Sequence, residues 1–128
     1  MWYGKEVTVT KNTTSASPVE EDIEVPYGMI ERVIIFFRPG ALGYVKATLW
    51  HGFHQFHPND PQHYVVGDDY VYDMVENYEL KEVPKSVTVV AWNTATQYDH
   101  TISVKVFVRE SVVSRITQAV KSVFGMSE

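Results

Sequence analysis

Three histidines at regular spacing are the first residues of this chain that could do chemistry. His51, His54 and His57 are imidazole ligands of the kind that bind metals. On an extended strand, however, His51 and His57 lie about 20 Å apart on one face and His54 faces the other way, because side chains alternate along a strand. The three residues therefore predict no shared metal site. A site that recruits one of them with His63 or Asp60 across a hairpin stays open.

Aspartates are the second set of candidate ligands, because calcium binds carboxylate oxygens in loops. The aspartates in question are Asp60, Asp68, Asp69 and Asp73. The chain lacks the Asp-x-Asp-x-Asp-Gly pattern of a calcium loop, and Asp68-Asp69 directly after Gly67 is typical of a turn. We therefore expect no bound metal and no cofactor.

Catalytic motifs are equally sparse. Asp99 and His100 are two residue types of a hydrolase triad, but adjacent residues on an extended chain face apart and no G-x-S-x-G elbow is present. Gly40 and Gly43 fit neither a phosphate loop nor a dinucleotide fingerprint. The absence of cysteine excludes thiol chemistry, disulfides and Cys-based zinc sites. We expect a protein that is not an enzyme.

Aromatic residues make up 13% of the chain and are the remaining candidates for ligand contact. Aromatic rings bury a large area at low entropic cost, so they serve both as core residues and as surface anchors. We assign Trp50 and Trp92 to the core on account of their size. Tyr70, Tyr72 and Tyr98 are the candidate ligand surface.

Length and composition indicate the class of protein that must position these residues. The 128 residues are 45% hydrophobic and carry a formal net charge of −5, as expected of one folded domain. An acidic chain is a poor partner for nucleic acid, because phosphates require basic patches. The longest strongly apolar run, Val33 to Phe37, is too short to span a membrane, and no secretory signal precedes it. We expect the chain to stay in the cytoplasm of the cell that makes it.

Short strands separated by turn residues account for most of the chain. Alternating or apolar runs predict strands near 5–10, 19–25, 29–37, 44–57, 63–66, 70–75, 87–92 and 101–109. Met29 to Phe37 is apolar on both faces, which is typical of a central strand covered on each side. Such regular strand spacing favours an all-β, antiparallel β-sandwich over residues 1–109, with a jelly roll as the preferred architecture.

The tail, residues 110–128, has a different period. Its apolar residues recur at helical spacing, and Ser111 and Gly125 suit the two ends of a helix. So short a helix is only marginally stable alone, so it must dock on its own sandwich, on a neighbouring subunit or on a membrane. A membrane is disfavoured, because Arg115 and Lys121 are the only basic residues on the polar face of the helix. We predict a subunit interface formed by Val112, Val113, Ile116, Val120, Val123 and Phe124.

The order of turn and strand signatures between Asn12 and Val108 carries a resemblance. The signatures are Asn12-Thr13-Thr14, Ser17-Pro18-Val19-Glu20-Glu21, Gly28-Met29-Ile30, Val33-Ile34-Ile35-Phe36, Gly40, Gly43, Gly52-Phe53-His54-Gln55, Pro58-Asn59, Gly67-Asp68-Asp69, Trp92-Asn93 and Tyr98-Asp99-His100. In this order they resemble small β proteins encoded among the structural genes of tailed phages and related archaeal viruses.

The resemblance implies a component of the virion, such as a capsid decoration, minor capsid or tail accessory subunit. Such a subunit acts through symmetric contacts with copies of itself and with other virion proteins such as the major capsid protein. The alternative is a carbohydrate-binding β-sandwich module, which requires exposed aromatic residues beside polar groups.

Overall fold

The computed structural model describes residues 1–110, and every regular element within them is a β-strand. The strands are β1 (Trp2–Val9), β2 (Val19–Glu24), β3 (Gly28–Phe37), β4 (Val45–His51), β5 (His54–His57), β6 (Val65–Val66), β7 (Tyr70–Leu80), β8 (Ser86–Asn93) and β9 (His100–Glu110). The predicted helix from Val112 to Phe124, with the whole predicted interface, lies outside the described residues. Within residues 1–110, the structure contains no helix that is long and apolar enough to cross a membrane.

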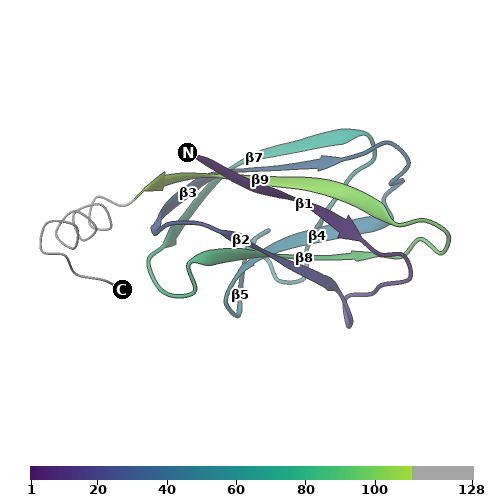
Figure 1. Cartoon of the computed structure of the whole chain (residues 1–128), viewed down its shortest axis with the longest axis horizontal. Helices are drawn as coiled ribbons and strands as arrows, with labels where there is room; N and C mark the ends of the chain where they lie inside the picture. Colours follow the sequence, from purple (N-terminus) through teal and green to yellow (C-terminus); the bar gives the residue numbers. More distant parts are fainter. Residues whose placement is uncertain (111–128) are drawn as a thin grey trace, which may run out of the picture.

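The strands form two antiparallel sheets, which lie one above the other in Figure 1. The first sheet has the order β1-β9-β3-β7. The second sheet has the order β2-β8-β4-β5, and β6 pairs with β4. The predicted all-β, antiparallel, sandwich-like fold is therefore confirmed.

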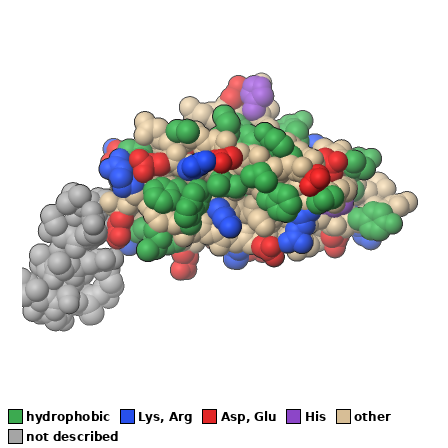
Figure 2. Space-filling view, turned by 90° about the horizontal axis from the view of Figure 1, so that it is seen from above, with side chains coloured by type: hydrophobic (Ala, Val, Ile, Leu, Met, Phe, Trp, Pro, Cys, Tyr) green, Lys and Arg blue, Asp and Glu red, His purple; other side chains and the backbone are tan. Residues whose placement is uncertain are grey.

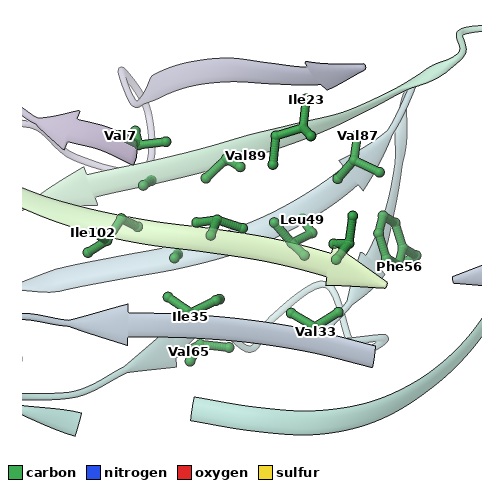
Figure 3. Close-up of a cluster of buried hydrophobic side chains, with 14 of the residues drawn as sticks. Val7, Ile23, Val33, Ile35, Leu49, Phe56, Val65, Val87, Val89 and Ile102 are labelled. Atoms are coloured by element: carbon green, nitrogen blue, oxygen red, sulfur yellow. The ribbon is translucent and has the colours of Figure 1, made fainter. Parts of the chain in front are cut away.

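The hydrophobic core fills the space between the two sheets (Figure 3). Alternating residues of each strand point into it, as the period of a strand requires. In β9 the predicted inward residues Ile102, Val104, Val106 and Val108 are all buried. Burying such side chains stabilises the fold by about 1.5–3 kcal/mol each, so this shared core holds the two sheets together.

Strand β3 is central in the first sheet, between β9 and β7, but only one of its faces is covered. Val33, Ile35 and Phe37 are fully buried in the core. Ile34 and Phe36 point away from the core and are half-buried, on a face over which the described residues place no other element. The expectation of cover on both sides is therefore wrong for the part of the chain that the structure describes.

The segment from His51 to His57 is a hairpin rather than one extended strand. The chain reverses at Gly52, whose φ of 61° is a conformation that glycine adopts without strain. His51 and His54 are paired across the turn, and both rings lie against Tyr78 of β7. The expectation that these two histidines face opposite ways is therefore wrong, because the turn folds them back onto each other.

Candidate ligand-binding groove

Both candidate core tryptophans lie on the outer face of the second sheet, which corrects their assignment to the core. On β4, Leu49 is fully buried and its neighbour Trp50 points outward. On β8, Ala91 is buried and Trp92 points outward. Strand alternation dictates these directions, and it outweighs the tendency of large aromatic rings to be buried.

Outward residues of β2, β8 and β4 form rows across this face. The first row is Asp22, Thr88 and Trp50; the next is Glu20, Val90 and Thr48; and Trp92 lies beside Lys46 in the row beyond. Side chains in one row are neighbours on adjacent strands, about 4.8 Å apart along the sheet. The face thus carries carboxylates at one edge, hydroxyl and apolar groups in the middle, and an indole ring at each end.

Two hollows open on this face. The larger, of about 790 Å³, lies over Asp22, Thr88 and Trp50 and extends to Phe53 at the tip of the β4–β5 hairpin. The smaller, of about 340 Å³, lies between Trp92 and the loop that ends in Tyr64. Three lining residues belong to both hollows, namely Ser15, Trp50 and Val90. The two hollows therefore form one continuous depression, which we call the aromatic groove.

The loop wall of the groove is held by a buried side chain. The amide nitrogen Nε2 of Gln55 lies 2.9 Å, 3.1 Å and 3.0 Å from the carbonyl oxygens of Pro58, Asp60 and His63. Tyr64 then packs edge-on against Trp92, with ring centroids 5.6 Å apart. The wall is therefore fixed to the strand that it borders.

The indole of Trp50 is also fixed in place. Its Nε1–H donates to Oγ1 of Thr48 at 2.9 Å, and that hydroxyl donates to the carbonyl of Val90 at 3.0 Å. The polar group of the indole is thereby satisfied within the protein. The apolar faces of the ring are what remains for a ligand.

The charge of the groove is negative. Glu20, Glu21 and Asp22 line it together with one lysine, Lys5, so the formal balance of these four side chains is 1 − 3 = −2. Lys5 Nζ lies 3.2 Å from Oε2 of Glu21, and the hydroxyl of Thr88 donates to Oδ1 of Asp22 at 2.6 Å. Glu20 has no such ion pair among the described residues.

The tyrosines of the predicted ligand surface lie outside this groove. Tyr72 is turned toward the second sheet, and its hydroxyl is 2.8 Å from Nε2 of His57. Tyr70 begins the edge strand β7, and Tyr98 lies in the loop before β9; both are exposed. The ligand surface of Tyr70, Tyr72 and Tyr98 stays a prediction.

Two histidines connect the second sheet to β7. His57 is buried, and its Nδ1 lies 2.6 Å from Oε2 of Glu76. His51 Nδ1 lies 2.7 Å from the hydroxyl of Tyr78. Burial raises the pKa of the Tyr72 and Tyr78 hydroxyls, and the nearby carboxylates of Glu76 and Glu82, respectively, add to the effect. These contacts close one edge of the sandwich.

The remaining candidate ligands are dispersed. Asp60 and His63 form an exposed pair at 2.9 Å without His51, His54 or His57. Asp68 accepts two backbone N–H groups of the turn at 40–42, and Asp73 binds Arg32. Asp99 accepts the backbone N–H of Lys11 at 2.9 Å. Within residues 1–110, no group of three or more His, Cys, Asp or Glu side chains is placed to hold a metal ion.

Sequence reasoning missed the groove although its signal was present. Thr48 and Trp50 share one face of their strand, and so do Thr88, Val90 and Trp92. That pattern, taken without regard to ring size, places both tryptophans among polar residues. The loop wall carried no comparable signal, because it depends on contacts of Gln55 with three separate carbonyls.

Comparisons with known proteins assign no family. The chain matches no family model, no curated protein and no solved structure. Its function is therefore inferred from its own residues.

Proposed function

We propose that this chain is a non-enzymatic structural subunit of a virion, built as a jelly roll and acting through symmetric protein contacts. The strand order supports the jelly roll. The chain places β1, β3, β7 and β9 in one sheet and β2, β4, β5, β6 and β8 in the other. Six connections therefore cross between the sheets, three before β4 begins and three after β6. Jelly rolls of eight strands recur in viral capsid proteins and in lectins.

The single observation that carries the assembly proposal is an apolar outer face on the first sheet. Figure 2 looks onto this side of the molecule, where hydrophobic side chains gather between charged ones. Register places the hydrophobic residues on the outward positions of all four strands: Trp2, Ile34, Phe36, Val71, Val75 and Phe107. We call these six residues the contact face.

Some apolar side chains of the contact face are unusually exposed to solvent. Val75 is 83% exposed and Trp2 is 43% exposed, with its ring edge-on to Phe107 at 5.2 Å. Apolar patches of this type mark protein contacts, and aromatic and arginine residues are enriched at them. A second subunit would cover the side of β3 that the described residues leave open.

Two ion pairs lie on and beside the contact face, whereas Lys105, next to Ile34, is in no ion pair among the described residues. Arg32 binds both carboxylate oxygens of Asp73, at 2.7 Å and 2.6 Å, and Arg38 binds Glu6 at 2.8 Å. Charges that are paired in this way repel a copy of the face only weakly, which suits a symmetric contact in which one patch meets the same patch. The predicted helix from Val112 to Phe124 would add a second contact with a neighbour such as the major capsid protein.

Light scattering across a wide concentration range tests the assembly. We expect the full chain to self-associate and Val75→Glu to lower its molar mass, because a buried carboxylate in a dimer contact is costly. A chain ending at Glu110 separates the contribution of the tail. A full chain that stays monomeric at every concentration contradicts the proposal.

Virus particles purified from the host provide the test of location. Mass spectrometry of those particles should find the chain in a fixed ratio to the major capsid protein. Its presence only in the host cytoplasm would refute the virion role.

A second candidate function, carbohydrate binding, is favoured by a separate observation. The aromatic groove lies on the second sheet, away from the contact face, and combines exposed rings with hydrogen-bonding side chains. Binding of a glycan there is compatible with assembly through the first sheet.

A further inference from the structure

We infer that the aromatic groove binds a neutral oligosaccharide, with sugar rings stacked on Trp50 and Phe53 and hydroxyl groups held by Asp22 and Glu20. This inference rests on the carbohydrate-binding candidate and is independent of the virion proposal. Three properties of the groove carry it: the position of its rings, its hydrogen-bonding groups and its charge.

The rings are placed for a ligand rather than for stability. Phe53 is 102% exposed at the hairpin tip, so it contributes nothing to the core. Trp50 lies at the same end of the groove, and Trp92 with Tyr64 at the other. Strand geometry separates the two tryptophans by roughly 14 Å, a span that several linked sugar rings can cover. The C–H faces of pyranose rings are apolar and match exposed aromatic faces.

The hydrogen-bonding groups between these rings match sugar hydroxyls. The Asp22 carboxylate accepts one bond from Thr88 and keeps further lone pairs free to accept from a ligand. Glu20 lies one row away on the same strand and is exposed. Acceptors along one edge and rings at both ends suit a ligand that is apolar on its ring faces and rich in hydroxyl donors at its periphery.

The charge of the groove selects a neutral ligand. With three carboxylates and one lysine, it repels nucleic acid, uronic acids and sulfated glycans. A proline-rich peptide could also stack on the rings, but it has no N–H at its prolines to donate to Asp22 or Glu20. The aligned carboxylates therefore favour a sugar over such a peptide.

The site is also preorganised. Thr48 orients the Trp50 indole, and Gln55 holds the loop that carries Tyr64. Groups that are fixed before binding lose little entropy when a ligand arrives. Flat stacking of a sugar on Trp50 therefore requires no rearrangement of the sheet.

Titration of the full chain tests the inference, with tryptophan fluorescence and calorimetry as readouts. The probes are cellohexaose, laminarihexaose and mannohexaose as neutral sugars, a heparin hexasaccharide as an anionic sugar, and decaproline as a peptide. We expect saturable binding of at least one neutral sugar and none of heparin or decaproline. Preferential binding of decaproline or heparin overturns the inference.

Variants locate the site. Phe53→Ala and Trp50→Ala should each weaken binding of the neutral sugar by about tenfold, because each removes a stacking ring. Tyr44→Ala is the matched control, since it removes an exposed aromatic ring that lines neither hollow and lies outside the contact face, and it should leave the affinity unchanged. Phe53 is fully exposed, so its variant is expected to fold normally even if Trp50→Ala does not.

The results distinguish failure of the carbohydrate-binding function from failure of the groove as its site. If no neutral sugar binds, both the groove site and the carbohydrate-binding candidate fail. If a sugar binds with unchanged affinity to Phe53→Ala and Trp50→Ala, the candidate stands and the groove is the wrong site.

Discussion

The two outer faces of this sandwich come from the same strand alternation and differ in almost everything else. The outer face of the first sheet presents Trp2, Phe36 and Val75 near the ion pair of Arg32 with Asp73. The outer face of the second sheet is hollowed and acidic, with Trp50 on β4 and Tyr64 on a bordering loop. We propose that one face contacts another protein and that the other binds an oligosaccharide.

The difference shows that the core leaves the outer faces free to diverge. Inward positions on both sheets are occupied by the same kinds of aliphatic side chain. The loops account for the contrast, because those at 14–18 and 58–64 rise beside the second sheet and make it concave. Function on such a scaffold depends on outward residues and loops rather than on the fold itself.

The largest expected effect distinguishes a core residue from a groove residue on the same strand. Leu49→Ala should lower the free energy of unfolding by about 2–5 kcal/mol, since Leu49 is fully buried and leaves a cavity. Trp50→Ala, one position on, should cost about 1–2 kcal/mol, because the ring lies on the outer face and is only partly buried. Urea unfolding measures both. Equal losses would mean that Trp50 is retained for stability rather than for binding.

An intermediate effect is expected at the edge that joins the sheets. His57→Ala should lower the free energy of unfolding by about 2–3 kcal/mol, because Glu76 and Tyr72 lose their partner in a partly buried site. His54→Ala is the control on the same strand, and its exposed side chain should matter by less than about 0.5 kcal/mol. Thermal or urea unfolding that fails to separate the two variants would show that this edge is not held by His57.

The smallest effect is a dependence on alkaline pH. The pKa of Tyr72 in the folded protein is raised above its ordinary 10.0 by burial and by Glu76, so the unfolded chain loses this proton first. Stability is therefore complete below pH 10 and falls as the pH rises through the folded pKa. Urea midpoints measured on either side of that pH should show the fall. Tyr72→Phe should reduce it, and an undiminished fall would assign it to other groups.

Much of the fold follows from the sequence because strand period is a local property. The alternation from Ile102 to Val108 predicted which β9 residues are buried, and Phe107, which breaks the pattern, lies outward against Trp2. The assignment of Trp50 and Trp92 to the core was wrong, because the size of their rings was given more weight than their position in the strand alternation. An apolar run such as Met29 to Phe37 indicates that both faces of the strand are apolar, but it does not predict which elements cover them.

Long-range contacts account for the rest of what the sequence did not predict. His57 and Glu76 are 19 residues apart and meet only because the hairpin at Gly52 turns β5 toward β7. Nothing local to either residue specifies that contact. The groove likewise unites residues of β1, β2, β4, β5 and β8 with residues of the connecting loops, which are distant in sequence and adjacent only in the folded sandwich.

The most direct test of separate functions for the two outer faces compares two matched substitutions, Val75→Glu on the contact face and Phe53→Glu in the groove. Both introduce a carboxylate at a highly exposed apolar position. Light scattering and sugar titration are performed on each variant together. We predict that Val75→Glu reduces self-association and keeps sugar affinity, and that Phe53→Glu does the reverse. Loss of both properties in either variant, or of neither, would contradict the division of labour between the two sheets.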